Sequence, residues 1–160
     1  MLQLPLLFNF FGKEIYKMAA IATIQDNQLT FGGPGGHTYH QFTASELGEG
    51  KVISFYTQNN LIRAIQIGDN KYGGDGGSLY PDQGQLSSDR TFILKALYAR
   101  HDSQHMVISG FEATIGDSDI NISFKQTSAA TCHLKLNLKV QFAGISFGSW
   151  IDSMVFQVIS

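Results

Sequence analysis

The most regular pattern of apolar and polar positions lies in the last third of the chain, between residues 133 and 142. Every second residue of this segment is apolar, and the residues between them are polar or charged. The apolar positions are Leu134, Leu136, Leu138, Val140 and Phe142. A period of two is typical of a β-strand with one buried face and one face in water. The pattern therefore predicts a half-buried strand.

Six further segments have the composition of strands, and no segment shows the apolar stripe of an amphipathic helix. The six are rich in β-branched and aromatic residues, and turn-forming residues lie between them. They are Val52–Thr57, Ile62–Ile67, Phe92–Tyr98, Met106–Ala113, Ile120–Phe124 and Met154–Val158. Seven or more short strands predict a closed or packed all-β domain. The length of 160 residues is enough for one ordinary core.

A glycine-rich frame occurs twice in the chain. Residues 31–39 (FGGPGGHTY) and 72–80 (YGGDGGSLY) share an aromatic residue, the pattern GGxGG and a final tyrosine, and they begin 41 residues apart. We call Gly32–Gly36 the first glycine loop and Gly73–Gly77 the second glycine loop. The repeat predicts two copies of one supersecondary unit and leaves room for a third. Near Gly116 the frame keeps only a glycine, so a third copy there would be degenerate.

The amino-terminal segment is apolar but lacks the organisation of a signal peptide. It has no basic start, Pro5 and Asn9 interrupt the apolar run, and charged residues between Lys13 and Lys17 occupy the place of a cleavage site. The run is also too short to span a bilayer. We expect residues 1–24 to form an extension that covers apolar surface and residues 25–160 to form the domain. A secreted and a cytoplasmic location both stay open.

Composition and charge narrow the range of partners. The chain is 43% hydrophobic and 15% charged, with a formal net charge of -2. Such a charge gives no long-range attraction to nucleic acid or to an anionic membrane, so neither partner is expected. Cys132 is the only cysteine, which excludes an intrachain disulfide and a cysteine-based zinc site but leaves an intermolecular bridge open. Residues 116–119 lack a complete calcium-loop pattern, so no metal is expected.

The candidate chemistry lies in the first glycine loop and in residues 148–152. A glycine loop offers exposed backbone N–H groups and room for a ligand, which suits a neutral hydroxylated molecule. A phosphate loop would need a following Gly-Lys-Ser/Thr, which neither loop has. The carboxylate of Asp152 can accept hydrogen bonds from two neighbouring hydroxyls of a sugar, at about 1.5–3 kcal/mol each. Gly148 would let the chain turn so that the amides of Ser149 and Trp150 face the same ligand.

The sequence contains no readable arrangement for catalysis. A hydrolase would need a nucleophile with its base, or two carboxylates that flank a bond. The acids are few and scattered, no Ser-His-Asp frame is present, and Cys132 lies inside a strand pattern. We therefore interpret the chain as a binding protein rather than an enzyme, with no cofactor.

From about Leu29 to Val158 the chain resembles the jacalin-related lectins. The matching features are, in order, the GGxGG loop, the strand Ile62–Ile67 with a second glycine loop, and a closing G-x-x-x-D-[SA]-[IM] pattern at residues 148–154. The resemblance implies an all-β fold, a β-prism I in which three Greek-key four-stranded sheets surround a pseudo-threefold axis. It also implies a metal-free sugar site. The uninterrupted chain around the first glycine loop is similar to the mannose/glucose-type members.

By position, the resemblance implies a carbohydrate site built from backbone amides and one acid. Gly36, Ser149 and Trp150 would donate amide N–H groups, and Asp152 would accept from two hydroxyls. The loop at residues 102–105 would lie where the family has a loop that tunes specificity. His37 is interpreted as a surface residue, and Trp150 as a packed aromatic rather than a stacking platform. The candidate carbohydrate-binding residues are thus Gly36, Gly148, Ser149, Trp150, Asp152, Gln104 and His105.

Some members of the family bind a second sugar at another Greek key. In this chain Arg63 occupies the position that corresponds to Asp152, and a guanidinium cannot accept hydroxyl protons, so one site per chain is expected. A single sugar held by a few hydrogen bonds gives a Kd on the order of 1 mM. We therefore expect a homo-oligomer that binds mannose/glucose-type glycans or glycoproteins through several sites. The alternative is a structural or interaction protein with an inactive sugar site.

Overall fold

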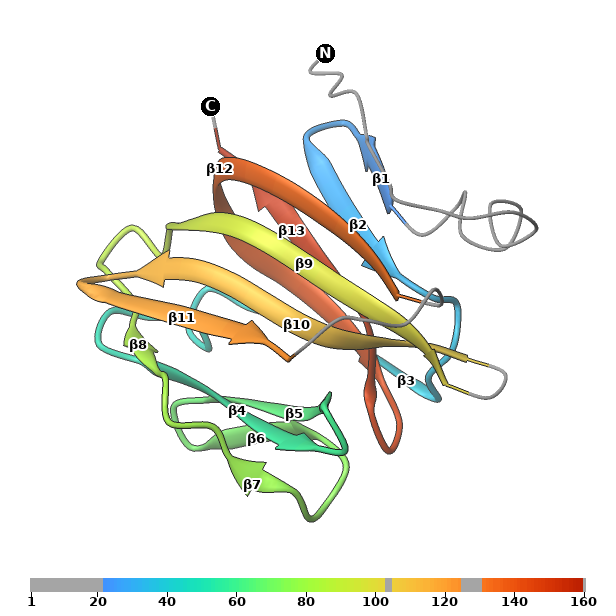
Figure 1. The fold of residues 1–160 in the computed structure, drawn as a ribbon. Helices are drawn as coiled ribbons and strands as arrows, with labels where there is room; N and C mark the ends of the chain where they lie inside the picture. The colour runs from blue at the N-terminus through green and yellow to red at the C-terminus, as the bar shows by residue number, and fades with distance from the viewer. Residues whose placement is uncertain (1–21, 103–104, 125–130, 160) are drawn as a thin grey trace.

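The computed structural model describes residues 22–102, 105–124 and 131–159, and within them it contains thirteen strands and no helix (Figure 1). The prediction of an all-β domain is confirmed, and none of the described residues forms a helix that could cross a membrane. The strands are β1 Ala22–Gln25, β2 Gln28–Gly32, β3 Thr38–Gln41, β4 Val52–Gln58, β5 Leu61–Ile67, β6 Asn70–Gly73, β7 Ser78–Leu79, β8 Gly84–Gln85, β9 Phe92–Asp102, β10 His105–Ile115, β11 Ser118–Ser123, β12 Thr131–Phe147 and β13 Ile151–Val158.

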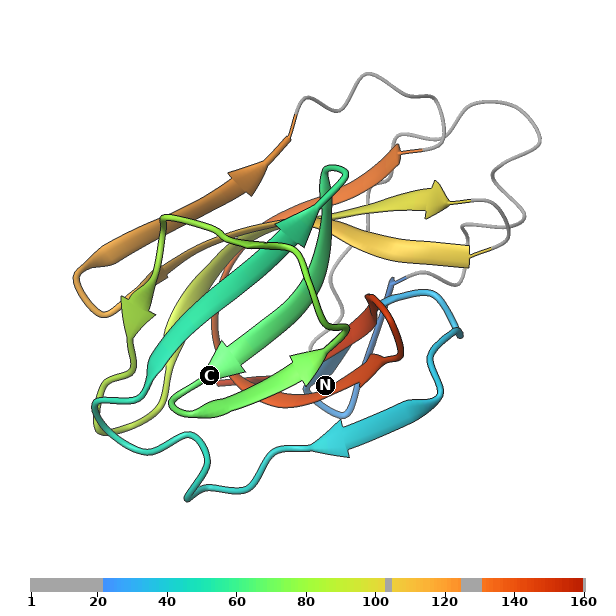
Figure 2. The ribbon, with the colours of Figure 1, turned by 90° about the horizontal axis from the view of Figure 1, so that it is seen from below.

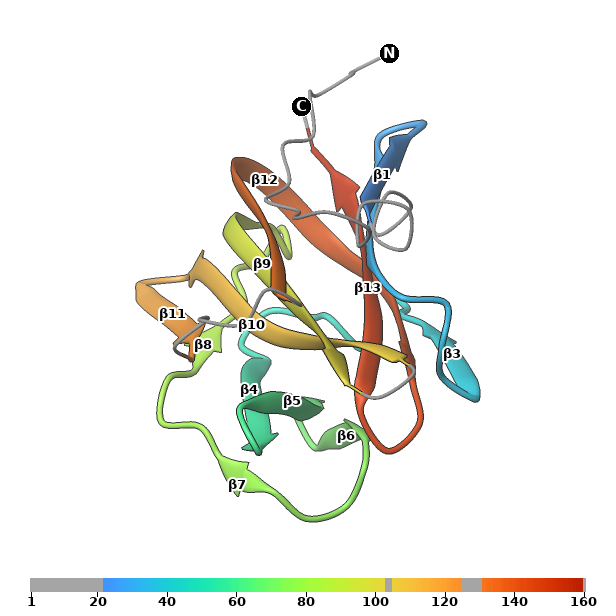
Figure 3. The ribbon, with the colours of Figure 1, turned by 45° about the vertical axis from the view of Figure 1, so that its right-hand side comes forward.

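The strands form two antiparallel sheets of eight and five strands. The larger sheet has the order β1-β2-β13-β12-β9-β10-β11, and β3 pairs with the second half of β12. The smaller sheet has the order β6-β5-β4-β7, with β8 paired to β4. Figures 1 and 3 show the smaller sheet below the larger one, so that the two enclose the core between them.

The strand β12 belongs to two walls of the fold. Residues 131–140 pair with β9, whereas residues 140–147 pair with β13, and a register shift between Lys135 and Leu138 interrupts the first ladder. Irregularities of this kind bend and twist a strand, which lets one strand continue from one wall into the next. Two of the three sheets that the sequence analysis expected are therefore joined by hydrogen bonds into a single sheet.

All seven strands predicted from the sequence are present. β9, β10 and β12 extend beyond the predicted bounds, because pairing with a long neighbour continues past the most apolar residues. The strands that were not predicted have two to five residues, too few to show a period. The sheet starts at Ala22, inside the segment that was assigned to the extension, and the rest of that segment lies outside the described residues.

Aromatic side chains hold the two sheets together. Phe55 of the smaller sheet meets Phe111 of the larger sheet with 4.9 Å between ring centroids, and within the larger sheet the ring of Phe142 lies 5.2 Å from that of Phe156. Burial of one such ring contributes about 1.5–3 kcal/mol to folding. Cys132 is fully buried in the same core, and burial raises the pKa of its thiol to about 12. A buried and protonated thiol is a poor partner for an intermolecular disulfide.

The backbone confirms that the glycine frame is one structural unit used twice. The Gly33 amide donates to the Asp152 carbonyl oxygen at 3.0 Å, and the Gly74 amide donates to the Arg63 carbonyl oxygen at 3.1 Å. The glycine that precedes each donor has nearly the same φ, 129° at Gly32 and 126° in the second loop. Arg63 therefore corresponds to Asp152, as the sequence indicated.

The degenerate third glycine loop that was predicted near Gly116 is not at that position. Gly116, with φ of 61°, lies in the turn between β10 and β11, and Gly68, with φ of 62°, lies in the turn between β5 and β6. The two glycines are thus counterparts of each other. Each lies in a hairpin turn, and in the second unit the glycine loop begins only after the next strand, β6. Residues 125–130, which follow β11 in the sequence, lie outside the described residues.

Glu46 ties the loop between β3 and β4 to β6. One of its carboxylate oxygens accepts from Tyr72 Oη at 2.7 Å and lies 2.8 Å from His40 Nε2, and the other accepts from the Thr43 amide at 2.7 Å. Burial acts to raise the pKa of Glu46, but these hydrogen bonds outweigh it and lower the pKa to about 2, from an ordinary value of 4.5. The ionised form of Glu46 is therefore favoured by the fold.

We expect Glu46→Gln to lower the free energy of unfolding by about 1–2 kcal/mol at pH 7 and by much less at pH 2. Because the pKa of Glu46 is depressed in the folded chain, its contribution is complete above pH 4.5 and is lost as the pH falls towards 2. Denaturant unfolding of both proteins at several pH values measures the difference. Glu49→Gln, at an exposed position in the same loop, is the matched control. An equal loss at pH 2 and pH 7 would contradict the assignment.

Candidate functional site

The first glycine loop and the turn between β12 and β13 meet at one end of the larger sheet (Figure 3). The amide of Gly33 donates to the Asp152 carbonyl oxygen at 3.0 Å, and the amide of His37 donates to the Phe147 carbonyl oxygen at 3.0 Å. Between these two points, Ser146 Oγ donates to the Gly35 carbonyl oxygen at 2.9 Å. Three hydrogen bonds thus fix the loop along its length against β12 and β13.

Glycine is required where the loop approaches the acid. Gly36 has φ of 94°, and a β-carbon added there would lie 2.5 Å from Ser146 Oγ and 3.1 Å from Asp152 Oδ2. Side-chain-bearing residues rarely adopt this backbone conformation, and the space is already filled. The backbone of Gly36 and the carboxylate of Asp152 are therefore neighbours, which is the arrangement that the sequence analysis expected.

These residues surround a hollow of about 460 Å³. Five of the seven candidate residues line it, together with Gly35 and His37; the five are Gly36, Gly148, Ser149, Trp150 and Asp152. Asp152 is buried, at only 7% exposure, whereas Ser149, which lines the same hollow, is exposed. Among the described residues, the hollow is thus lined by backbone of the first glycine loop, by the β12–β13 turn and by one carboxylate.

The structure says less about the other two candidates. Gln104 lies outside the described residues, and His105 begins β10, where it pairs with Asp102, but its side chain lies outside the described part. A β-carbon added at Gly33 would lie 2.8 Å from Cβ of Met106, so the first glycine loop packs directly on the start of β10. The roles of Gln104 and His105 in the site stay predictions.

His37 is a lining residue that sequence reasoning assigned to the surface. It is exposed, and it also borders the hollow, where its Cδ2 atom would lie 3.3 Å from a β-carbon added at Gly148. Its position directly after the GGxGG pattern was the available signal. We add His37 to the candidate site as a lining residue.

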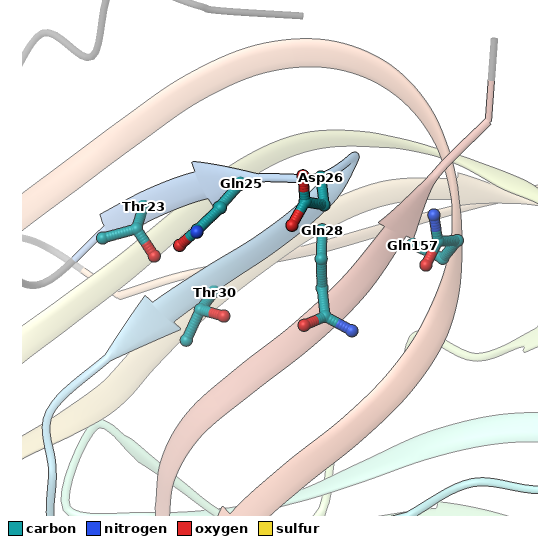
Figure 4. Close-up of a pocket in the computed structure, with 6 residues that line it drawn as sticks. All are labelled: Thr23, Gln25, Asp26, Gln28, Thr30 and Gln157. Atoms are coloured by element: carbon teal, nitrogen blue, oxygen red, sulfur yellow. The ribbon is translucent and has the colours of Figure 1, made fainter. Parts of the chain in front are cut away.

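Two other polar hollows lack this combination of groups. Figure 4 shows one of about 370 Å³ on the outer face of β1, β2 and β13, and its lining residues are Thr23, Gln25, Asp26, Gln28, Thr30 and Gln157. The other, of about 420 Å³, lies beside the second glycine loop, and its lining residues are Thr57, Gln58, Asn59, Asn60, Gly77, Ser78 and Phe124. Neither has a buried acid. No three His, Cys, Asp or Glu side chains of the described residues could hold a metal ion together.

Solved structures with the same fold are lectins. A variant of Malaysian banana lectin matches with a TM-score of 0.55 at 17% identity, covering 88% of this chain and 99% of that chain. A mannose-binding jacalin-related lectin from Ananas comosus matches with a TM-score of 0.50 at 13% identity, covering 84% and 99%. This chain therefore has the β-prism fold of jacalin-related lectins. No protein-family model matches its sequence, and no curated protein matches it either.

The β-prism likeness confirms the predicted fold. Because the sequence identity is only 13–17%, the likeness does not show which residues of this chain correspond to binding residues of the lectins. The evidence for the candidate site is therefore its own set of contacts. The fold likeness extends over almost the whole length of the banana and Ananas comosus proteins, 99% of each chain.

We expect Gly36→Ala to lower the free energy of unfolding by about 1–3 kcal/mol, because the new methyl group meets Ser146 Oγ and the backbone must keep a positive φ. Gly48→Ala is the matched control, since its nearest neighbour would be a carbonyl oxygen at 3.6 Å and its φ is not positive. Denaturant unfolding of the three proteins gives the comparison. Equal stability of the two variants would show that the first glycine loop tolerates a side chain at position 36, beside Asp152.

Proposed function

We propose that the protein is a carbohydrate-binding lectin that recognises mannose/glucose-type glycans in the hollow between the first glycine loop and the β12–β13 turn. The observation that carries the proposal is the buried carboxylate of Asp152 beside the backbone of Gly36, with the amides of Ser149 and Trp150 around the same hollow. The mannose-binding protein from Ananas comosus, which has the same fold, supports the ligand class.

The chemistry of the hollow matches a pair of neighbouring sugar hydroxyls. An ionised carboxylate only accepts hydrogen bonds, and its two oxygens can take one hydroxyl proton each. The backbone amides of Gly36, Ser149 and Trp150 only donate, and they would donate to the oxygen lone pairs of the same hydroxyls. Each hydroxyl then donates and accepts at once, a pattern that a neutral polyol satisfies and a phosphate does not.

A site of this kind needs little rearrangement to bind. Its donors are backbone groups on a loop that three hydrogen bonds fix, so few side-chain rotamers are lost when the ligand enters. The affinity for one sugar residue is still limited by the few contacts, to a Kd on the order of 1 mM. We expect binding to leave the sugar intact, because Asp152 is the single acid among the described residues that line the hollow, whereas cleavage of a glycosidic bond needs two.

We expect Asp152→Asn to weaken binding to mannose-bearing glycans at least about tenfold, because an amide nitrogen replaces one of the two acceptor oxygens. Asp69→Asn is the matched control, since it removes an acid of the same type from an exposed turn between β5 and β6. A glycan array, read with and without excess mannose, identifies the ligand and tests the loss.

Two outcomes would contradict the proposal in different ways. If Asp152→Asn bound glycans as tightly as the wild-type protein, the assignment of the site would be wrong, but the protein would still be a lectin. An array on which the folded wild-type protein binds no glycan would instead favour the alternative, a structural or interaction protein on a prism with an inactive sugar site. Release of reducing sugar from the bound glycan would indicate an enzyme.

Weak single sites predict that the protein assembles. Two or more sites held together raise the apparent affinity by about 10²–10⁴ without any new contact to the sugar. We therefore expect light scattering to give a mass that is a multiple of 17.6 kDa. A strict monomer at micromolar concentration would count against the expected homo-oligomer but not against sugar binding.

A further inference from the structure

Arg63 occupies in the second unit the position that Asp152 occupies in the first, but its side chain is engaged differently. Its Nε donates to the Asp75 carbonyl oxygen at the tip of the second glycine loop, at 2.5 Å. Its Cδ would lie 3.5 Å from a β-carbon added at Gly77, so the side chain runs along that loop. Arg63 is therefore held by the second glycine loop and does not line the hollow beside it.

The guanidinium of Arg63 extends to the candidate sugar site. Its Cζ lies 4.7 Å from the ring centroid of Trp150, over one face of the indole. A contact of this type contributes about 0.5–2 kcal/mol, with the larger value where water is excluded, and Trp150 is half-buried here. Since Trp150 also lines the hollow, the cation supports one wall of it from behind.

The second glycine loop also contacts the turn that carries the proposed donors. A β-carbon added at Gly74 would lie 2.1 Å from the Ser149 carbonyl oxygen, so the two backbones touch. Figures 2 and 3 both show the β12–β13 turn next to the end of β6, where this loop begins. Inside the turn, one backbone hydrogen bond closes residues 148–150, from the Gly148 amide to the Trp150 carbonyl oxygen at 3.1 Å. The turn thus depends on external contacts for its orientation.

We propose that Arg63 is a positioning residue for the carbohydrate site, through which the second glycine loop orients Trp150 and the amides beside it. The proposal rests on the proposed function and extends it. An arginine in place of the acid removes the acceptor that a second sugar would need and supplies a cation that reaches the first site. The second unit of the repeat then serves the first one instead of binding a ligand of its own.

The experiment uses the only tryptophan of the chain as its reporter, because all tryptophan fluorescence comes from Trp150. Arg63→Met keeps the length of the side chain and removes its charge, and Arg63→Lys keeps a cation. Lys71→Met is the matched control, since it removes the other cation over a ring, with Lys71 Nζ 4.0 Å from the Tyr56 centroid in the same small sheet. Each variant is compared by acrylamide quenching, thermal unfolding and binding to mannose-bearing glycans.

We expect Arg63→Met to make Trp150 more accessible to acrylamide and to weaken glycan binding by about two- to tenfold, the loss that corresponds to one such contact. Arg63→Lys should restore part of both properties, and Lys71→Met should change neither. Unchanged quenching and affinity in Arg63→Met would overturn the proposal. Equal losses of affinity in Arg63→Met and Lys71→Met would also overturn it, because general destabilisation would then explain both.

The quenching measurement needs no ligand, which separates this proposal from the function on which it rests. If the wild-type protein binds no glycan but Arg63→Met still exposes Trp150, the proposed function fails and the orienting contact stands. If the wild-type protein binds glycans and Arg63→Met leaves both quenching and affinity unchanged, the positioning role fails and the lectin function stands.

Discussion

The contact on which the structure depends is the close approach of two backbones at Gly32, where a side chain would collide with Asp152 and Ser153. The hydrogen bond from Gly33 to the Asp152 carbonyl oxygen joins the end of β2 to the start of β13. Because the strands meet so closely, the chain that continues into the first glycine loop must pass over the carboxylate of Asp152. The position of the hollow thus follows from the backbone contact between the end of β2 and the start of β13.

The second unit repeats this backbone contact with a different side chain, and the comparison separates fold from chemistry. Gly73 meets Arg63 and Ala64 as Gly32 meets Asp152 and Ser153. The glycines therefore belong to the fold, and the side chain of the residue whose carbonyl each loop binds, Asp152 or Arg63, decides what the loop does. A carboxylate gives an acceptor beside backbone donors, whereas a guanidinium gives a support for a neighbouring ring.

Sequence patterns predicted what depends on local alternation and missed what depends on distant partners. Strands such as β12 were predicted because their apolar residues repeat over ten positions, but two-residue strands such as β7 exist only through pairing with β4. Gly116 was assigned to the wrong part of the repeat because a fixed spacing ignores the differing lengths of strands. The contact between Arg63 and Trp150 joins residues far apart in the chain, so no pattern along the sequence indicates it. The proximity of Gly36 and Asp152 was expected only because the sequence resembles a known family.

The continuity of β12 has a consequence for how the repeated units behave as parts. In a solenoid each repeat contacts only its neighbours, and repeats can be lost or gained one at a time. Here a single strand supplies ladder bonds to β9 at one end and to β13 and β3 at the other. A boundary drawn between the two walls of the eight-stranded sheet would cut β12 and leave unpaired edges on both sides. These two walls therefore cannot be separated into independent repeats.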